Sequence, residues 1–281
     1  MSFATPDAAS ARASSSGSVA DSILKASAGF WFLVAAAGQW IFVLFILGFY
    51  AAPTLSGNFE AWDKNTFMTH GYVAGDTAGN LAFAVHVMMA AVITASGTIQ
   101  LIPWIRAHAI SFHRWSGRTF IFIAFVISLA GLFLNATRGE GTFAHIPITI
   151  NAVLLMFCAG QTIGFVRAGY IDAHRKWALR TFMLMNGVWF LRVGMMAWMF
   201  GKMALVGGPQ KFDGNFYAFW SYGSYLVPLA VLELYLRAQE RGGAGAKVGV
   251  ALLLAAFTVA MGAGIAGVTI AIWLPLLQKA W

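Results

Sequence analysis

The residues of this sequence that could carry out chemistry are histidines placed in or beside apolar runs. His113 and His174 each precede an apolar run, His86 lies inside one, and His145 stands at the start of another. Two neutral imidazoles from facing helices, at matching depth, are the ligand set of a non-covalently bound b-type haem. We therefore predict that His113 and His174 ligate one haem, and that His86 and His145 ligate a second.

A simpler interpretation is that these histidines contact lipid headgroups and ligate no metal. Histidine and arginine at a membrane interface also hold the phosphate headgroups of lipids. Gln100 is similarly open to two interpretations, because it lies 14 residues after His86 on nearly the same helical face. It either hydrogen-bonds a cofactor or joins two helices.

Arg192 is the other residue that demands an explanation, because it lies inside an apolar run. A charge at the centre of a bilayer costs about 2.5–3.5 kcal/mol even on insertion scales, so it needs a partner. A haem propionate, a quinone oxygen or an anionic substrate would serve, and Glu233 is the protein-only alternative. In an unbroken helix, the spacing of 18 residues from His174 would place both side chains on one face.

The composition indicates a protein whose solvent is mostly lipid. Of the 281 residues, 59% are hydrophobic and 10% are charged, whereas soluble domains carry roughly 25% charged residues. The mean hydropathy is +0.73. This excludes a soluble enzyme, a nucleic-acid-binding module and a disordered regulator. The absence of a phosphate-binding loop and of HExxH, GxSxG and CxxCH motifs disfavours several other classes, and whether the protein is an enzyme stays open.

Apolar runs of the length needed to cross a bilayer predict an all-α, polytopic membrane protein. Residues 1–28, rich in Ser and Ala, are predicted to form a disordered cytoplasmic tail, and 29–281 a single transmembrane domain. We predict seven spans, at 29–52, 78–104, 115–136, 146–168, 179–203, 217–236 and 248–276.

Lysine and arginine residues set the predicted orientation. Twelve lie on the side that holds the N-terminus and five on the other, with Arg192 inside a span. The positive-inside rule then places the N-terminus in the cytoplasm and the C-terminus in the periplasm of a bacterial inner membrane. The net charge of +8 is explained as this bias together with contact to lipid phosphates. Nucleic acid is not a predicted partner.

An internal repeat organises the middle of the chain. The segments GTIQLIPWIRAHAISFHRWSGRTF (97–120) and CAGQTIGFVRAGYIDAHRKWALRTF (158–182) align at an offset of 61 residues. This offset pairs Gln100 with Gln161 and His113 with His174. After one inserted residue, Trp115 and Arg118 match Trp177 and Arg180. The spans within 78–203 are therefore predicted to be two copies of one helical hairpin, forming a four-helix core with the other spans at its periphery.

These residues resemble a known family. The pattern of His86, Gly97, Gln100, Arg106, His113–Trp115, Gly117–Arg118, His174–Arg175, Trp177, Arg180 and Arg192 resembles domain-of-unknown-function family 2306, a family of bacterial predicted membrane proteins. That resemblance implies a membrane fold and states no activity. The core also resembles, more loosely, the ascorbate-reducible transmembrane cytochromes b, which implies two b haems and electron transfer across the membrane.

The sequence thus favours a b-haem-binding electron-transfer or quinone-linked redox protein. The basic residues predicted to neutralise propionates, or to bind a quinone or lipid headgroup, are Arg106, Arg114, Arg118, Arg175, Arg180 and Arg192. Two alternatives remain at this point. One is an accessory subunit that binds other membrane proteins, and the other is a haem-free transporter or lipid-binding protein that uses the same histidines and arginines.

Overall fold

The computed structural model describes residues 8–65, 71–138, 142–208 and 213–280, and every secondary-structure element within these ranges is a helix. The long helices are α1 (Ala8–Ile46), α3 (Thr77–Leu101), α5 (Ile110–Arg138), α6 (Thr142–Arg167), α7 (Ile171–Met185), α8 (Gly187–Val206), α9 (Gly214–Arg241) and α10 (Ala244–Val268). The shorter segments are η1 (Leu47–Ala51), α2 (Ala52–Ser56), η2 (Phe59–Lys64), α4 (Pro103–His108), η3 (Thr269–Trp273) and α11 (Leu274–Ala280). The predicted all-α class is confirmed.

Six helical segments of the described chain are long and apolar enough to cross a membrane, one fewer than the sequence predicted. They are Val19–Ser56, Thr77–Leu101, Ile110–Arg138, His145–Arg167, Gly187–Val206 and Ala244–Lys279. The predicted span 217–236 lies within α9, which is not among them. Tyrosines, serines and Glu233 interrupt the apolar residues of α9, and this lowers its hydropathy. The count of seven is therefore not confirmed.

The N-terminal segment also differs from the prediction. Residues 8–28 were predicted as part of a disordered tail, but they belong to α1, which continues to Ile46 without interruption. The rest of the predicted tail, residues 1–7, lies outside the described part of the chain. Composition misled the prediction because Ala, abundant in this segment, is also the strongest helix former.

A break at Asn186 divides the predicted span 179–203 into α7 and α8. Asn186 has φ −83° and ψ 4°, and its side-chain amide donates to the Phe182 carbonyl at 2.9 Å. An asparagine that bonds its own backbone competes with helix continuation. The following Gly187 also lies against Asn151 and Tyr225, where an added Cβ would come within 3.0 and 3.2 Å of their side chains. His174 and Arg192 are therefore not on one continuous helix.

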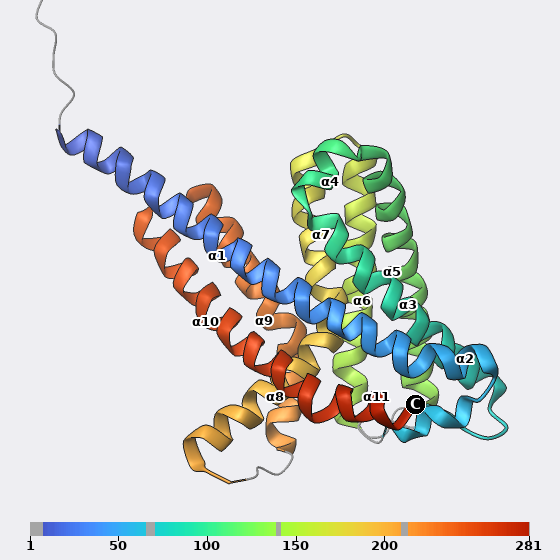
Figure 1. The fold of residues 1–281 in the computed structure, drawn as a ribbon. Coiled ribbons are helices and arrows are strands. Elements are labelled where there is room, and N and C mark those ends of the chain that lie inside the picture. The colour runs from blue at the N-terminus through green and yellow to red at the C-terminus, as the bar shows by residue number, and fades with distance from the viewer. Residues whose placement is uncertain (1–7, 66–70, 139–141, 209–212, 281) are drawn as a thin grey trace, which may run out of the picture.

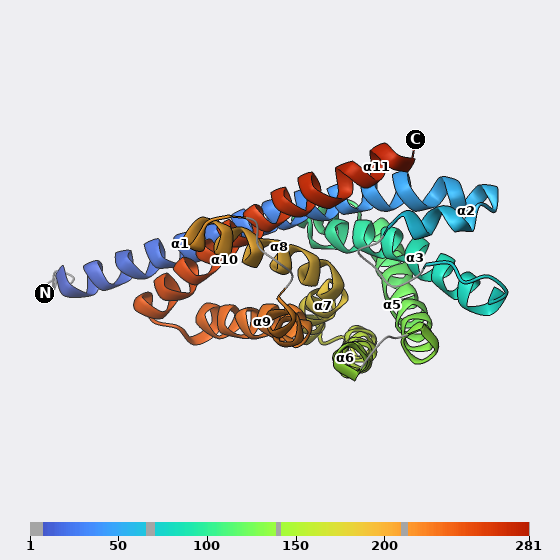
Figure 2. The same cartoon turned by 90° about the horizontal axis from the view of Figure 1, so that it is seen from below.

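The two predicted hairpins are present. In the first copy α3 packs on α5, in the second α6 packs on α7, and α5 packs on α6 between them. Figure 1 shows these helices gathered on one side of the molecule, with α1 and α10 running obliquely past them. Figure 2 shows α1 and α10 side by side along one edge, opposite α6.

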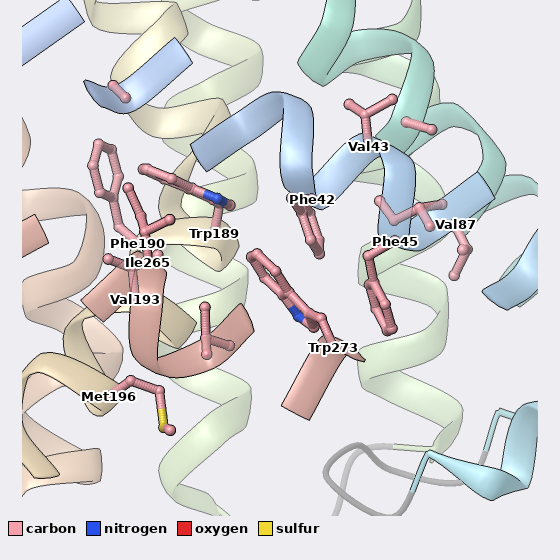
Figure 3. Close-up of a cluster of buried hydrophobic side chains, with 14 of the residues drawn as sticks. Phe42, Val43, Phe45, Val87, Trp189, Phe190, Val193, Met196, Ile265 and Trp273 are labelled. Atoms are coloured by element: carbon pink, nitrogen blue, oxygen red, sulfur yellow. The ribbon is translucent and has the colours of Figure 1, made fainter. Parts of the chain in front are cut away.

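The largest apolar cluster joins α1, α3, α8 and α10. Its centre is a stack in which Trp273 lies 5.2 Å from Phe42 and 5.7 Å from Phe45, measured between ring centroids. Figure 3 shows this stack between the side chains of α8 and those of α3. Trp273 belongs to η3, a π-helical turn, and such turns re-aim side chains within an otherwise regular helix. This cluster fixes the position of α8, and hence of Arg192, relative to α3.

Candidate functional site

The junction between α3 and α5 brings Arg106 back onto the end of α3. Pro103 begins α4 directly after Ile102, whose backbone is extended. The Arg106 guanidinium then donates to the Gln100 carbonyl at 3.2 Å and to the Leu101 carbonyl at 2.9 Å. These carbonyls lack intrahelical partners at the C-terminus of α3. Burial and the charge of Arg175 lower the pKa of Arg106, which shows that two cations share this end of the bundle.

Gln100 joins the two helices of the first hairpin. Its amide nitrogen donates to the His113 carbonyl at 3.3 Å and to the Ser116 hydroxyl. Gly117 leaves room for it, since an added Cβ there would come within 3.3 Å of the Gln100 amide oxygen. Of the two roles considered for Gln100, these contacts are those of a helix-joining residue, and they fix the start of α5 where His113 stands.

The ring of His174 is held in a defined orientation by the second hairpin. Its Nδ1 lies 2.9 Å from the backbone carbonyl of Thr162 in α6. The Thr162 hydroxyl in turn lies 3.0 Å from the Thr181 hydroxyl of α7 and donates to the Cys158 carbonyl at 2.8 Å. This bond between Nδ1 and a carbonyl fixes the tautomer and leaves Nε2 as the nitrogen available to a ligand. The sequence offered Thr162 only as a polar residue near the end of an apolar run, so this positioning contact was missed.

His113 lies near His174, as the repeat predicted. The two rings interact electrostatically, and Arg106 and Arg114 act on His113 in the same way. The Nδ1 atom of His113 is buried and has no hydrogen-bond partner in the described structure. Buried polar atoms are rarely left unpaired, so this nitrogen calls for an explanation.

Two further arginines at this end stack on tryptophan rings. Arg118 lies over the Trp115 ring at 5.5 Å, and Arg180 lies over the Trp177 ring at 4.7 Å. The same stacked pair thus occurs in both copies of the repeat. Arg180 is also engaged in an ion pair with Glu233, with N–O distances of 2.6 and 3.0 Å. Glu233 is therefore the partner of Arg180 and not, as the alternative prediction had it, of Arg192.

Arg114 and Arg175 are exposed cations beside the histidine pair. The ion pairs of the described residues are Arg138–Asp76, Lys176–Glu240, Arg180–Glu233, Lys202–Asp213 and Lys247–Asp21. None of these includes Arg106, Arg114 or Arg175. Three arginines and two histidines therefore lie at this end, and none of these arginines has an ion-pair partner in the described part of the chain. Such a cluster favours an anionic ligand.

His86 and Arg192 form a separate polar pair within the apolar part of the molecule. The His86 ring lies near the Ile127 backbone and Arg192. Its Nδ1, like that of His113, is buried without a hydrogen-bond partner among the described residues. Gly131 makes room for it, since an added Cβ there would come within 3.2 Å of the imidazole. Arg192 lies over the Phe42 ring at 5.5 Å and donates to the Val188 carbonyl at 3.0 Å.

The second predicted histidine pair, His86 with His145, stays a prediction. His145 lies in the first turn of α6, where its carbonyl accepts from the Asn135 side chain at 3.1 Å. His86 lies near Ile127 of α5 and Arg192 of α8. Of the two predicted histidine pairs, the structure brings His113 near His174.

The fold and this site define a class: a helical membrane protein with a repeated hairpin whose two copies bring together a histidine pair and a cluster of arginines. The chain matches the predicted membrane protein family DUF2306 over residues 83–236. The match covers more than half of the chain, so the protein belongs to this family. The comparison with curated proteins found no match, and the comparison with solved structures found none either.

Proposed function

We propose that the protein is a membrane redox protein that binds one b-type haem between His113 and His174. The observation that carries this proposal is the hydrogen bonding of the two imidazole rings. The His174 ring is oriented through Nδ1, and the neighbouring His113 has a buried Nδ1 without a partner. A bond from ring nitrogen to carbonyl is the usual support of a histidine that ligates a metal.

The residues present fit such a group. His113 and His174 would hold a b-type haem, whose propionates would need neutralising cations. Arg106, Arg114 and Arg175 lie beside the histidines and would serve the propionates. No cluster of three or more His, Cys, Asp or Glu able to hold a bare metal ion occurs within the described ranges. A site with two histidines would suit a haem, in which the porphyrin supplies the other ligands of the iron.

The chemistry of the haem would be one-electron transfer, and the protein's part is to hold and shield it. Gln100 fixes the start of α5, and Thr162 fixes the His174 ring. We extend the proposal to location: a bacterial inner membrane with this basic end in the cytoplasm, supported by the lysine and arginine bias. His86 with Arg192 is proposed as a polar site for a quinone, and not as half of a second haem site.

A second candidate function rests on the unpaired arginines. The same cluster would bind an anionic lipid headgroup or a transported anion without any haem, because its positive charges lack carboxylate partners among the described residues. Absorbance separates the two candidates, since only the haem protein has a visible spectrum.

The test is a dithionite-reduced minus air-oxidised visible spectrum of the protein purified in detergent. The protein is expressed in cells supplied with a haem precursor. We expect sharp b-type bands and about one haem per chain by pyridine haemochrome, because one histidine pair is juxtaposed. His113→Ala and His174→Ala are each expected to lose these bands.

His108→Ala is the matched control, because His108 lies at the same end of the bundle but stacks on Trp104 in α4. We expect it to keep the spectrum of the unaltered protein. A featureless spectrum of the unaltered protein would remove the haem proposal, and bands that survive in both site variants would show that other residues ligate the iron.

A further inference from the structure

A pocket of about 370 Å³ lies between α7 and α9, at the same end of the molecule as the histidine pair but lined by other residues. The two helices pack against each other, and Figure 2 shows them as neighbours. Its lining consists of one apolar residue and six charged ones: Leu236, Lys176, Arg180, Arg237, Arg241, Glu233 and Glu240. Its volume lies within the range of small-molecule sites.

Both carboxylates of the pocket are engaged across the gap between the helices. Glu233 of α9 accepts two hydrogen bonds from Arg180 of α7. Seven residues further along α9, about two helical turns, Glu240 is paired with Lys176 of α7. These two ion pairs connect the walls of the pocket, and each carboxylate neutralises one positive charge.

The two remaining cations are left for a ligand. Arg237 and Arg241 are both exposed and stand four residues apart, so they share one face of α9. Neither belongs to an ion pair in the described part of the chain. Four basic and two acidic side chains leave the pocket with a net of two positive charges.

The chemistry of these two residues selects the ligand. A guanidinium presents a planar fork of donors that matches the oxygens of a phosphate. Basic pockets between helices at the membrane surface are sites for anionic lipid headgroups. The lining also includes one apolar residue, Leu236.

We propose that the pocket between α7 and α9 binds a phosphate group, held by Arg237 and Arg241, with an anionic lipid headgroup or a soluble phosphate compound as its source. The Arg180–Glu233 pair keeps the walls in place without contributing net charge. This site is distinct from the histidine pair and does not depend on the haem proposal.

The experiment titrates the full-length protein in neutral detergent micelles with cardiolipin, phosphatidylcholine or inorganic phosphate, and follows the thermal unfolding midpoint. Cardiolipin is expected to raise the midpoint, because ligands that bind only the folded state stabilise it. In the double variant Arg237→Ala/Arg241→Ala, the cardiolipin concentration required should rise about tenfold or more. The double lysine variant should fall between the two, because it keeps the charge but loses the fork.

Arg167→Ala is the matched control, an exposed arginine at the same end of the bundle but outside the pocket, and a change of less than about twofold is expected. A shift with inorganic phosphate that competes with cardiolipin identifies a soluble phosphate as the source, and a shift with cardiolipin alone identifies the lipid. A double variant with unaltered affinity, or an equal shift with phosphatidylcholine, overturns the proposal. The visible spectrum of the same variants reports separately on the haem.

Discussion

Gly264→Ala is expected to destabilise the protein strongly, whereas the same substitution two residues away is not. A Cβ at this position would lie 2.1 Å from the backbone carbonyl oxygen of Val193, and backbone cannot turn aside as a flexible side chain can. The helices α8 and α10 would have to separate, which opens the cluster that positions Arg192. We expect a loss of about 3 kcal/mol, the upper range for overpacking, measured as the thermal or denaturant midpoint in detergent.

Gly262→Ala supplies the control two residues away on the same helix. The nearest atom to a Cβ there is Val34 Cγ1 at 3.8 Å, an ordinary contact. Since alanine is the better helix former by about 1 kcal/mol, this variant should be as stable as the unaltered protein or slightly more stable. Equal losses in the two variants would show that the close approach of α8 and α10 does not occur.

Arg138→Ala is expected to have the second large effect, because Arg138 closes the first hairpin at the end opposite the histidine pair. Its guanidinium donates to Asp76 at 2.8 and 3.0 Å, to Asn80 at 2.7 Å and to the Gly71 carbonyl at 2.9 Å. Its side chain is only 10% exposed. Its removal takes four hydrogen bonds from these acceptors, although Asn80 and Asp76 each keep one from a backbone N–H. We expect a loss of about 3 kcal/mol at neutral pH.

The pH dependence gives a second measure of the same contact. A hydrogen bond from the Gly79 N–H, followed by the bond from Arg138, lowers the pKa of Asp76. A lowered folded-state pKa means that the stabilisation is present above the unfolded value of about 3.9 and is lost as the pH falls through the lower folded value. The difference in stability between the unaltered protein and Arg138→Ala should therefore shrink on acidification through that window.

Lys202→Ala is the comparison for this variant, because Lys202 also pairs with an aspartate at a helix start, Asp213, at 3.2 Å. It is more exposed, at 33%, so its loss should cost no more than about 1 kcal/mol. Equal effects of the two substitutions, or a difference for Arg138→Ala that does not vary with pH, would contradict the assigned role of Arg138.

The sequence by itself determined the features that depend on local composition and on repetition. Hydropathy is a sum over neighbouring residues, so it identified a helical membrane protein and located most of its spans. The offset of 61 residues predicted two equivalent hairpins, and it paired His113 with His174 and the Trp115–Arg118 stack with its counterpart. Equivalent sequences fold alike, and packing the copies together brings equivalent residues near one another.

Tertiary structure alone decided which distant groups meet. Asn186 ends α7 because its amide takes a carbonyl of the preceding turn and Gly187 packs closely on α6 and α9. That break separated His174 from Arg192, although periodicity had placed them on one face. Glu233 meets Arg180 because α9 lies against α7, and the same packing creates the pocket beside them. Such pairings depend on the rotation and depth at which helices pack, and hydropathy along the chain does not encode these quantities.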